Sequence, residues 1–330
     1  MRPRLHHLLL LLPIVFPSLL QGQATSPIRA AYTSIAIQMT PLYLMKDLNL
    51  PRKHGLDVEM LYIPVSSRAI QAALAGEIQF MTSGGVANIN ADMAGADFVG
   101  LTATLNTFIF KILSQPEVKG IEGLKGKRVG ISRLGGAGDF SIRYALDRWK
   151  IQPEKDVAII QLGGEVELTA ALQNKGIDAA IVSEPFATLL EQSGFKVLYD
   201  LSRLDVPYTL HGIGTRKSYI RTNRDTVNRF MKAYLEGIAI FKNNKDLALD
   251  TLKKYARLTD VSLMRSIHDE YARRLIRNVP YPSPEGIQTI IDQLAKTRPQ
   301  AKTLNPNDFI DPTILREIDA SGFVKQLYGQ

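Results

Sequence analysis

The residues 72–85 read AALAGEIQFMTSGG, and this stretch decides how the fold is interpreted. A short helical pattern ends at Gly76, the apolar run Ile78–Met81 predicts a strand, and polar and glycine residues follow at 82–85. Glycine is favoured directly after a helix because it adopts the left-handed backbone conformation without strain. The stretch therefore predicts a helix that returns at once into a buried strand with a polar exit.

The same arrangement recurs at 171–185, where the chain reads ALQNKGIDAAIVSEP. Gly176 ends the helical pattern, Ile177–Val182 is the predicted strand, and Ser183, Glu184 and Pro185 form the polar exit. Two related α/β lobes explain this repeat. Any helix–glycine–strand unit gives a similar pattern, so the repeat alone leaves that alternative open.

Strands and helices alternate on both sides of these two units, which favours largely parallel sheets flanked by helices. From residue 221 to the end the pattern is mainly helical. We therefore expect an α/β protein with two lobes, mostly parallel sheets flanked by helices and a helical C-terminal part. The further predicted strands are Ile28–Tyr32, Leu56–Ile63, Phe98–Leu105, Phe108–Leu113, Lys127–Ile131 and Val157–Gln161. The C-terminal helices are expected at Arg224–Asn243, Leu247–Tyr255, Val261–Leu275, Glu285–Lys296 and Pro312–Asp319.

The composition excludes several classes of chemistry. The chain has 330 residues, a formal net charge of +8 and no cysteine. Thiolate nucleophiles, CxxC redox pairs and Cys-based zinc sites are therefore excluded. The basic residues are interspersed with acidic ones in helical patterns, which indicates solvated helix faces, and we expect no nucleic-acid partner.

The N-terminus is typical of a secretory signal peptide at residues 1–24. Arg2 and Arg4 precede an apolar run from Leu8 to Leu20, and the small residues Gly22 and Ala24 predict cleavage after Ala24. The run is shorter than the ~20 residues that span a bilayer, and two prolines interrupt it, so an uncleaved anchor is disfavoured. No cysteine follows that could carry a lipid. We expect a free periplasmic protein.

A glycine-rich turn lies at 130–138, with the sequence GISRLGGAG. Gly136 and Ala137 stand where a Walker A loop requires Lys and Ser or Thr, and the third glycine of a Rossmann fingerprint is missing. What remains is a strand-to-helix turn whose free N–H groups could hold an oxyanion. Asp139 is predicted to cap the helix; if it points inward, its charge opposes an anion.

Catalytic patterns are sparse. Three histidines lie beyond the signal peptide, and no Ser stands in a G-x-S-x-G elbow. His54 and His268 are expected at the surface. His211 lies near a predicted crossing between the lobes, where a structural or ligand-contact role is favoured over metal binding. We therefore expect no catalytic residues, no metal site and no cofactor, and a chain that is not an enzyme.

Five short stretches carry a resemblance to a known family. The chain resembles the type 2 periplasmic solute-binding proteins of ABC transporters, in the branch that binds alkanesulfonates, nitrate or taurine and thiamine-pyrimidine precursors. The resemblance covers almost all residues from 28 to the end. The matching stretches are His54–Glu59 (HGLDVE), Ala73–Ile78 (ALAGEI), Leu124–Gly130 (LKGKRVG), Gly176–Ala179 (GIDA) with Glu184-Pro185, and Ser321–Phe323 (SGF).

The resemblance implies the two-lobed type 2 fold, with residues 25–114 in lobe 1, 115–212 in lobe 2 and 213–330 returning to lobe 1. The crossings are expected near Leu113–Glu117 and Val206–Gly214. It also implies a small polar solute in an interlobe cleft, a permease partner in the inner membrane and a monomer. Carried over by position, the ligand-binding residues are Tyr32, Ser34, Ser83, Gly84, Gly135, Gly136, Ser183 and Glu184, to which His211 is added.

The sequence leaves the ligand open. Glu184 opposes a sulfonate or nitrate unless it is paired, and Arg133 is a candidate partner. Tyr32, Phe140 and Tyr208 are candidates for an aromatic clamp or for the core. Two alternatives stay open: an exported enzyme or metal-dependent protein like the thiamine-precursor synthases, which the missing cysteine disfavours, and a sensor partner of a membrane kinase.

Overall fold

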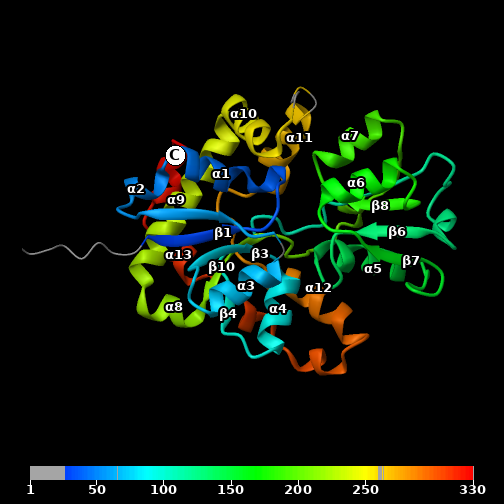
Figure 1. Cartoon of the computed structure of the whole chain (residues 1–330). Coiled ribbons are helices and arrows are strands. Elements are labelled where there is room, and N and C mark those ends of the chain that lie inside the picture. Colours follow the sequence, from blue (N-terminus) through cyan, green and yellow to red (C-terminus); the bar gives the residue numbers. More distant parts are fainter. Residues whose placement is uncertain (1–26, 65, 259–261, 263, 330) are drawn as a thin grey trace, which may run out of the picture.

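A computed structural model describes residues 27–64, 66–258, 262 and 264–329 (Figure 1). The predicted signal peptide and its cleavage site after Ala24 lie outside the described residues. The described strands form two sheets of five strands each, joined by two segments of chain (Figure 1). We call each sheet with the helices packed on it a lobe.

The first sheet has the strand order β2-β1-β3-β10-β4. Four strands run in one direction, and β10 is antiparallel to its neighbours β3 and β4. The register of β1 on β2 runs from Ile28 opposite Val58 to Tyr32 opposite Tyr62, so both strands end in tyrosine at the same edge. The bounds are β1 Ile28–Tyr32, β2 Val58–Tyr62, β3 Phe80–Ser83, β4 Phe98–Gly100 and β10 Gly212–Arg216.

The second sheet has the order β7-β6-β8-β5-β9 and the same design, with β5 antiparallel to β8 and β9. The bounds are β5 Lys111–Ser114, β6 Arg128–Ile131, β7 Ala158–Gln161, β8 Ala179–Val182 and β9 Lys196–Asp200. Each sheet is therefore mostly parallel, and the predicted fold class is confirmed at this level.

Helices cover the faces of both sheets (Figure 1). The second lobe carries α5 Ala137–Arg148, α6 Glu165–Gln173 and α7 Phe186–Gln192. The first lobe carries α1 Thr40–Asp47, α2 Leu50–Lys53, α3 Ser66–Leu74, α4 Gly85–Met93, α8 Lys217–Thr222, α9 Arg224–Asn243, α10 Lys245–Ala256, α12 Pro284–Ala295, α13 Thr313–Ala320 and α14 Phe323–Leu327. Helix α11 Met264–Glu270 runs into the π-helical turn η4 Tyr271–Leu275. The short 3-10 turns are η1 Ile37–Met39, η2 Glu122–Leu124, η3 Leu201–Leu204, η5 Pro299–Thr303 and η6 Pro306–Phe309.

The chain crosses between the sheets at 101–110 and at 201–211. The first crossing comes earlier than predicted, because β5 belongs to the second sheet and not to the end of the first. An apolar strand between two sheets carries no local signal for the sheet it joins. The strands β9 and β10 were not predicted, and Gly212 and Gly214 weaken the strand pattern of β10.

The two crossing segments pair with each other. Leu105 and His211 form an antiparallel bridge, with the Leu105 N–H donating to the His211 carbonyl at 2.9 Å. Gly212 approaches Thr102 so closely that a Cβ at this position would lie 1.9 Å from the Thr102 carbonyl oxygen. Glycine at 212 is therefore required for this close approach.

Three rings bind the crossings to the second lobe. Tyr208 stacks on Phe108 at 4.3 Å and on Phe140 of α5 at 5.1 Å between ring centroids. Tyr208 is 1% exposed and Phe140 is 6% exposed. Both aromatic candidates are thus core residues of the hinge, which leaves Tyr32 as the remaining candidate for a ligand contact.

Candidate functional site

A cluster of tyrosines lies at the carboxyl ends of β1 and β2. Tyr32 stacks on Tyr62 with 5.1 Å between ring centroids and an interplanar angle of 24°. Tyr32 is 9% exposed, whereas Tyr62 is 47% exposed. The register of the two parallel strands brings the rings together, since both are the last residue of their strand. This edge of an open α/β sheet is where ligands bind in such folds.

Two further tyrosines support Tyr32 from behind. Tyr43 of α1 meets Tyr32 edge to face at 5.3 Å, and Tyr255 of α10 stacks on Tyr43 at 3.9 Å. The Tyr255 hydroxyl donates to Asp47 at 2.8 Å, and burial followed by this carboxylate raises the pKa of Tyr255. Tyr32, Tyr43, Tyr62 and Tyr255 therefore form one packed cluster, which we call the tyrosine surface, and Tyr62 is its exposed ring.

Helix α6 of the second lobe faces this surface. Burial and then the charge of Glu167, in the first turn of α6, raise the pKa of Tyr62. The neighbouring Glu165 accepts hydrogen bonds from the Ser183 N–H at 3.0 Å and the Ser183 hydroxyl at 2.7 Å. Burial raises the pKa of Glu165 to about 7.

Glu184 is 5% exposed and is fully engaged within its own lobe. Its carboxylate pairs with Lys111 of β5 at 2.9 Å and accepts from the Thr188 N–H and hydroxyl at 3.1 and 2.8 Å. The pairing partner is thus Lys111, and the prediction of Arg133 was wrong. Lys111 stands opposite Val182 in the antiparallel pair of β5 and β8, which brings its ammonium group to the exit of β8.

Tyr271 brings the C-terminal part of the chain to the same carboxylates. Its hydroxyl is buried and has no hydrogen-bond partner among the described residues. Burial, followed by the charges of Glu184 and Glu165, raises its pKa. The charges at the exit of β8 and at the start of α6 therefore act on the turn η4.

The glycine loop does not offer the free donors that the sequence suggested. The N–H of Gly135 donates to Asp139 at 2.8 Å, and the N–H of Gly136 donates to the Arg133 carbonyl at 3.1 Å. The other Asp139 oxygen accepts from Arg143 at 2.6 Å. Asp139 therefore closes the loop and is neutralised by Arg143, so these two glycines hold the turn and have no N–H group to spare for a ligand.

Three predicted residues of the first lobe serve the hinge and the sheet. The carbonyl of Ser34 accepts from the Tyr43 hydroxyl at 3.1 Å. The Ser83 hydroxyl is buried without a partner among the described residues, and a Cβ at Gly214 would lie 2.7 Å from it. Gly84 lies under the second crossing, where a Cβ would come within 2.2 Å of the Leu210 carbonyl oxygen.

The three histidines among the described residues are buried or half-buried. His211 is 5% exposed, and burial lowers its pKa to about 4, with the Gln38 backbone as a weaker opposing contact. His54 is half-buried and bonds Glu236 at 3.0 Å. His268 is 1% exposed and bonds the Phe241 carbonyl at 2.7 Å, at the border of a polar pocket of about 550 Å³. The expected surface positions of His54 and His268 were wrong, because each ring is held by a distant element.

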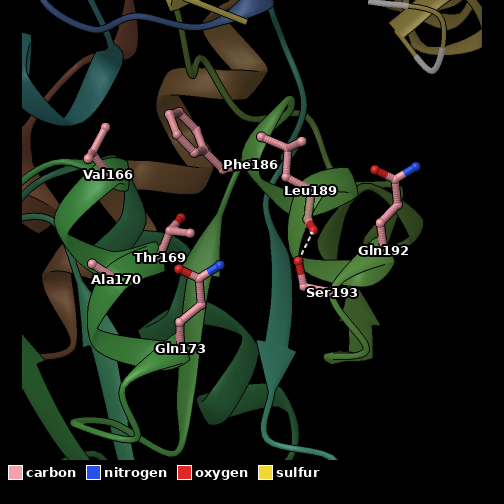
Figure 2. Close-up of a pocket in the computed structure, with 8 residues that line it drawn as sticks. All are labelled: Val166, Thr169, Ala170, Gln173, Phe186, Leu189, Gln192 and Ser193. Atoms are coloured by element: carbon pink, nitrogen blue, oxygen red, sulfur yellow. Dashed lines mark hydrogen bonds between the residues drawn. The ribbon is translucent and has the colours of Figure 1, made fainter. Parts of the chain in front are cut away.

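A groove of about 470 Å³ runs between α6 and α7 (Figure 2). Val166, Thr169, Ala170 and Gln173 form one wall, and Phe186, Leu189, Gln192 and Ser193 form the other. None of the predicted site residues lines it. It is a surface groove on the flank of the second lobe, separate from the tyrosine surface.

Tyr62, Glu165 and Tyr271 are the residues of the interlobe region that the sequence did not single out. The only sequence feature that pointed to Glu165 is that Gly164-Glu165 follows a predicted strand as a polar exit. In the described part of the chain, no three His, Asp or Glu side chains gather in a way that could hold a metal ion. Within the same residues, no helix is both long enough and apolar enough to cross a membrane.

The fold is shared with known solute-binding proteins. The structure of the periplasmic aliphatic sulphonate binding protein SsuA from Escherichia coli superposes with a TM-score of 0.69 at 18% identity, over 88% of this chain and 99% of that one. At this identity the likeness shows the fold alone. It confirms the predicted two-lobed periplasmic-binding-protein architecture.

Three relatives cover most of the chain. The putative binding protein YtlA of Bacillus subtilis is 25% identical over 292 residues, which are 83% of this chain and 85% of that one. A putative ABC transporter periplasmic binding protein of Brachyspira hyodysenteriae is 24% identical over 270 residues, with 77% and 75% covered. The riboflavin-binding protein RibY of Chloroflexus aurantiacus is 25% identical over 245 residues, with 71% and 68% covered.

These likenesses confirm the predicted role as a substrate-binding component. Residues 36–248 match the sequence profile described as NMT1/THI5 like. The match begins just after β1 and ends within α10, so it includes the other four strands of the first sheet, the whole second sheet and both crossings. The chain therefore belongs to the NMT1/THI5-like family.

Proposed function

We propose that this chain is the periplasmic solute-binding component of an ABC importer, and that it captures a planar heteroaromatic solute between its two lobes. The observation that carries the solute class is the stacked pair of Tyr32 and Tyr62, with Tyr62 47% exposed at the strand ends. An exposed ring at the end of a braced stack presents a flat face to a further ring. Stacked aromatic pairs contribute about 0.5–1.5 kcal/mol beyond the area they bury.

The second lobe supports the same solute class. Glu167 lies close enough to Tyr62 to raise its pKa, so a flat molecule on Tyr62 also meets the start of α6. Closure of two lobes on a ligand is the usual motion of such a fold. The relative RibY is described as riboflavin-binding, and riboflavin is a planar tricyclic heteroaromatic molecule.

The remaining parts of the proposal follow from the relatives. The Brachyspira protein is described as an ABC transporter periplasmic binding protein, so we propose a permease partner and a periplasmic location. We further propose that the protein acts as a monomer and catalyses no reaction. Its task is to bind, close and deliver.

A thermal-shift screen tests the solute class. The probes are riboflavin, 4-aminopyrimidine, taurine and nitrate, each added to the purified protein. A ligand at ~100 times its Kd adds about 2.7 kcal/mol to the stability, which gives a clear shift in Tm. We expect stabilisation by at least one aromatic probe. Stabilisation by taurine or nitrate alone would refute the aromatic assignment.

A matched pair of variants tests the site. Tyr62→Ala removes the exposed ring and should weaken binding of an aromatic probe about three- to tenfold. Tyr199→Ala removes a tyrosine of the second sheet that packs on Trp149, 5.0 Å away between ring centroids, and should leave binding unchanged. Equal losses in both variants would show that Tyr62 is not a ligand contact.

A further inference from the structure

Glu165 is half-buried and differs from the buried acids Glu184 and Asp139 of the second lobe in having no counter-charge among the described residues. Glu184 pairs with Lys111 at 2.9 Å, and Asp139 pairs with Arg143 at 2.6 Å. Among the described residues Glu165 has no cationic partner and is held only by two hydrogen bonds from Ser183. A carboxylate taken out of water without a cation is costly, unless a bound group supplies what the protein does not.

The surroundings of Glu165 add acceptors and negative charge. Ser183 has already given its N–H and its hydroxyl proton to Glu165, and Lys111 is shared between Glu184 and Glu191. The partial positive charge at the N-terminus of α6 offsets only part of the charge of Glu165 and Glu167. A ligand group that reaches this point therefore has to bring its own donor or positive charge.

The first lobe contributes Tyr271 to the surroundings of Glu165. Tyr271 is buried at 2% exposure, and its hydroxyl is unpartnered among the described residues while its pKa responds to Glu184 and Glu165. Gly135 and Gly136, which were expected to receive an oxyanion, have spent their N–H groups inside the loop. The protein thus offers the Glu165 carboxylate and the neutral Tyr271 hydroxyl, whereas the N–H groups of Gly135 and Gly136 are already bonded within the loop.

We propose that Glu165 is a specificity-determining residue of the interlobe site, which selects heteroaromatic solutes bearing an N–H donor or a positive charge and rejects sulfonates and nitrate. This inference rests on the proposed function, since it assumes that the solute lies between Tyr62 and α6. An N–H group that donates to Glu165 gains a charge-assisted hydrogen bond. An oxyanion at the same point faces like charge from Glu165, with Glu167 beside it.

The affinities of two variants separate this proposal from its alternatives. Glu165→Gln keeps the size of the side chain and an oxygen acceptor for Ser183 but removes the charge. Glu117→Gln removes one exposed charge that follows the far end of β5, at the edge of the second sheet opposite to Ser183 and Glu165, and is the control. Titration calorimetry at pH 8 uses riboflavin, 4-aminopyrimidine, taurine and nitrate as probes.

We expect an aromatic probe that binds the wild-type protein to bind Glu165→Gln about ten- to hundredfold more weakly, as loss of a hydrogen bond to a charged group predicts. Glu117→Gln should stay within about threefold of the wild type, as for an exposed charge. If the aromatic probe binds both variants equally well, the role of Glu165 is overturned and the proposed function stands. If the wild type binds only taurine or nitrate, or binds no probe, the proposed function fails, and the role of Glu165 fails with it.

Discussion

Replacing Glu165 by Gln should change the stability of the protein in a pH-dependent way. Burial raises the pKa of Glu165 from 4.5 to about 7 in the folded protein. An acid with a raised pKa holds its proton longer when folded, so the wild-type protein loses stability as the pH rises from 4.5 to about 7. Below this window both states are protonated, and above it the folded state carries the full cost of a half-buried carboxylate.

The magnitude follows from the width of that window. Each pH unit between the two pKa values corresponds to 1.36 kcal/mol, so the full cost is about 3 kcal/mol at pH 8. Gln loses up to one of the two hydrogen bonds with Ser183, a loss of about 1 kcal/mol. Glu165→Gln should therefore be about 1 kcal/mol less stable than the wild type at pH 4.5 and about 2 kcal/mol more stable at pH 8.

Urea unfolding at a series of pH values measures this difference. The other titratable and charged groups near the site are Glu167, Glu184, Lys111 and Tyr271, with Glu191, Glu270 and Asp200 farther out, and all are present in both proteins. These groups contribute equally to the free energy of unfolding of both proteins, as long as Glu165 does not change their pKa values. Their contributions therefore cancel in the difference between variant and wild type. A difference that stays constant from pH 4.5 to 8 would refute the account of Glu165 as a carboxylate strained by burial. Glu167→Gln should show a small and flat difference.

Three further predictions concern the lobes and the hinge. Lys111→Met leaves Glu184 buried without its cation and should cost about 3–5 kcal/mol in urea unfolding at pH 7; a cost below 1 kcal/mol would contradict the pairing. Gly212→Ala forces a Cβ against the Thr102 carbonyl and should cost about 1–3 kcal/mol, whereas Gly138→Ala, whose Cβ meets its nearest atoms at 3.6 and 3.8 Å, should be close to neutral. Phe108→Ala removes one ring of the stack with Tyr208 and should lower the free energy of unfolding by about 3–5 kcal/mol. If Phe108→Ala lost less stability than a variant of an exposed ring, such as Tyr62→Ala, the assignment of Phe108 to the core of the hinge would be contradicted.

Patterns of burial and turn chemistry predict the local structure well. The bounds Ile28–Tyr32 and Arg224–Asn243 agree with β1 and α9, because the first is a short apolar run and the second has one continuous helical apolar face. Thr40 stands before Pro41 in the sequence pattern of a helix N-cap, but its hydroxyl is buried and unpartnered in the described structure, and the 3-10 turn η1 precedes the helix. An N-cap depends on the contacts of one side chain, and here the turn η1 occupies the position before the helix.

The site could be predicted only as far as single strand exits allow. Tyr32 and Ser183 were placed correctly at the ends of β1 and β8, because each follows a buried strand. Tyr62 and Tyr271 belong to the candidate site because of the charged residues that act on them. Glu167 is 105 residues from Tyr62 in the chain (62 to 167), and Glu184 is 87 residues from Tyr271 (184 to 271). Whether the Gly135 and Gly136 N–H groups are free depends on Asp139 and the Arg133 carbonyl, and no periodicity in the sequence reports such bonds.

Under the proposal made above, the charge of the solute is decided by Glu165 and not by Glu184, the carboxylate that the sequence pointed to. Glu184 stands in the most recognisable strand exit, yet Lys111 and Thr188 satisfy it within the second lobe. Glu165 stands one strand and one helix away and has hydrogen bonds but no cation among the described residues. The fold is shared with a sulphonate-binding protein, but a shared fold does not fix the ligand, and the proposal therefore rests on the side chain at the start of α6.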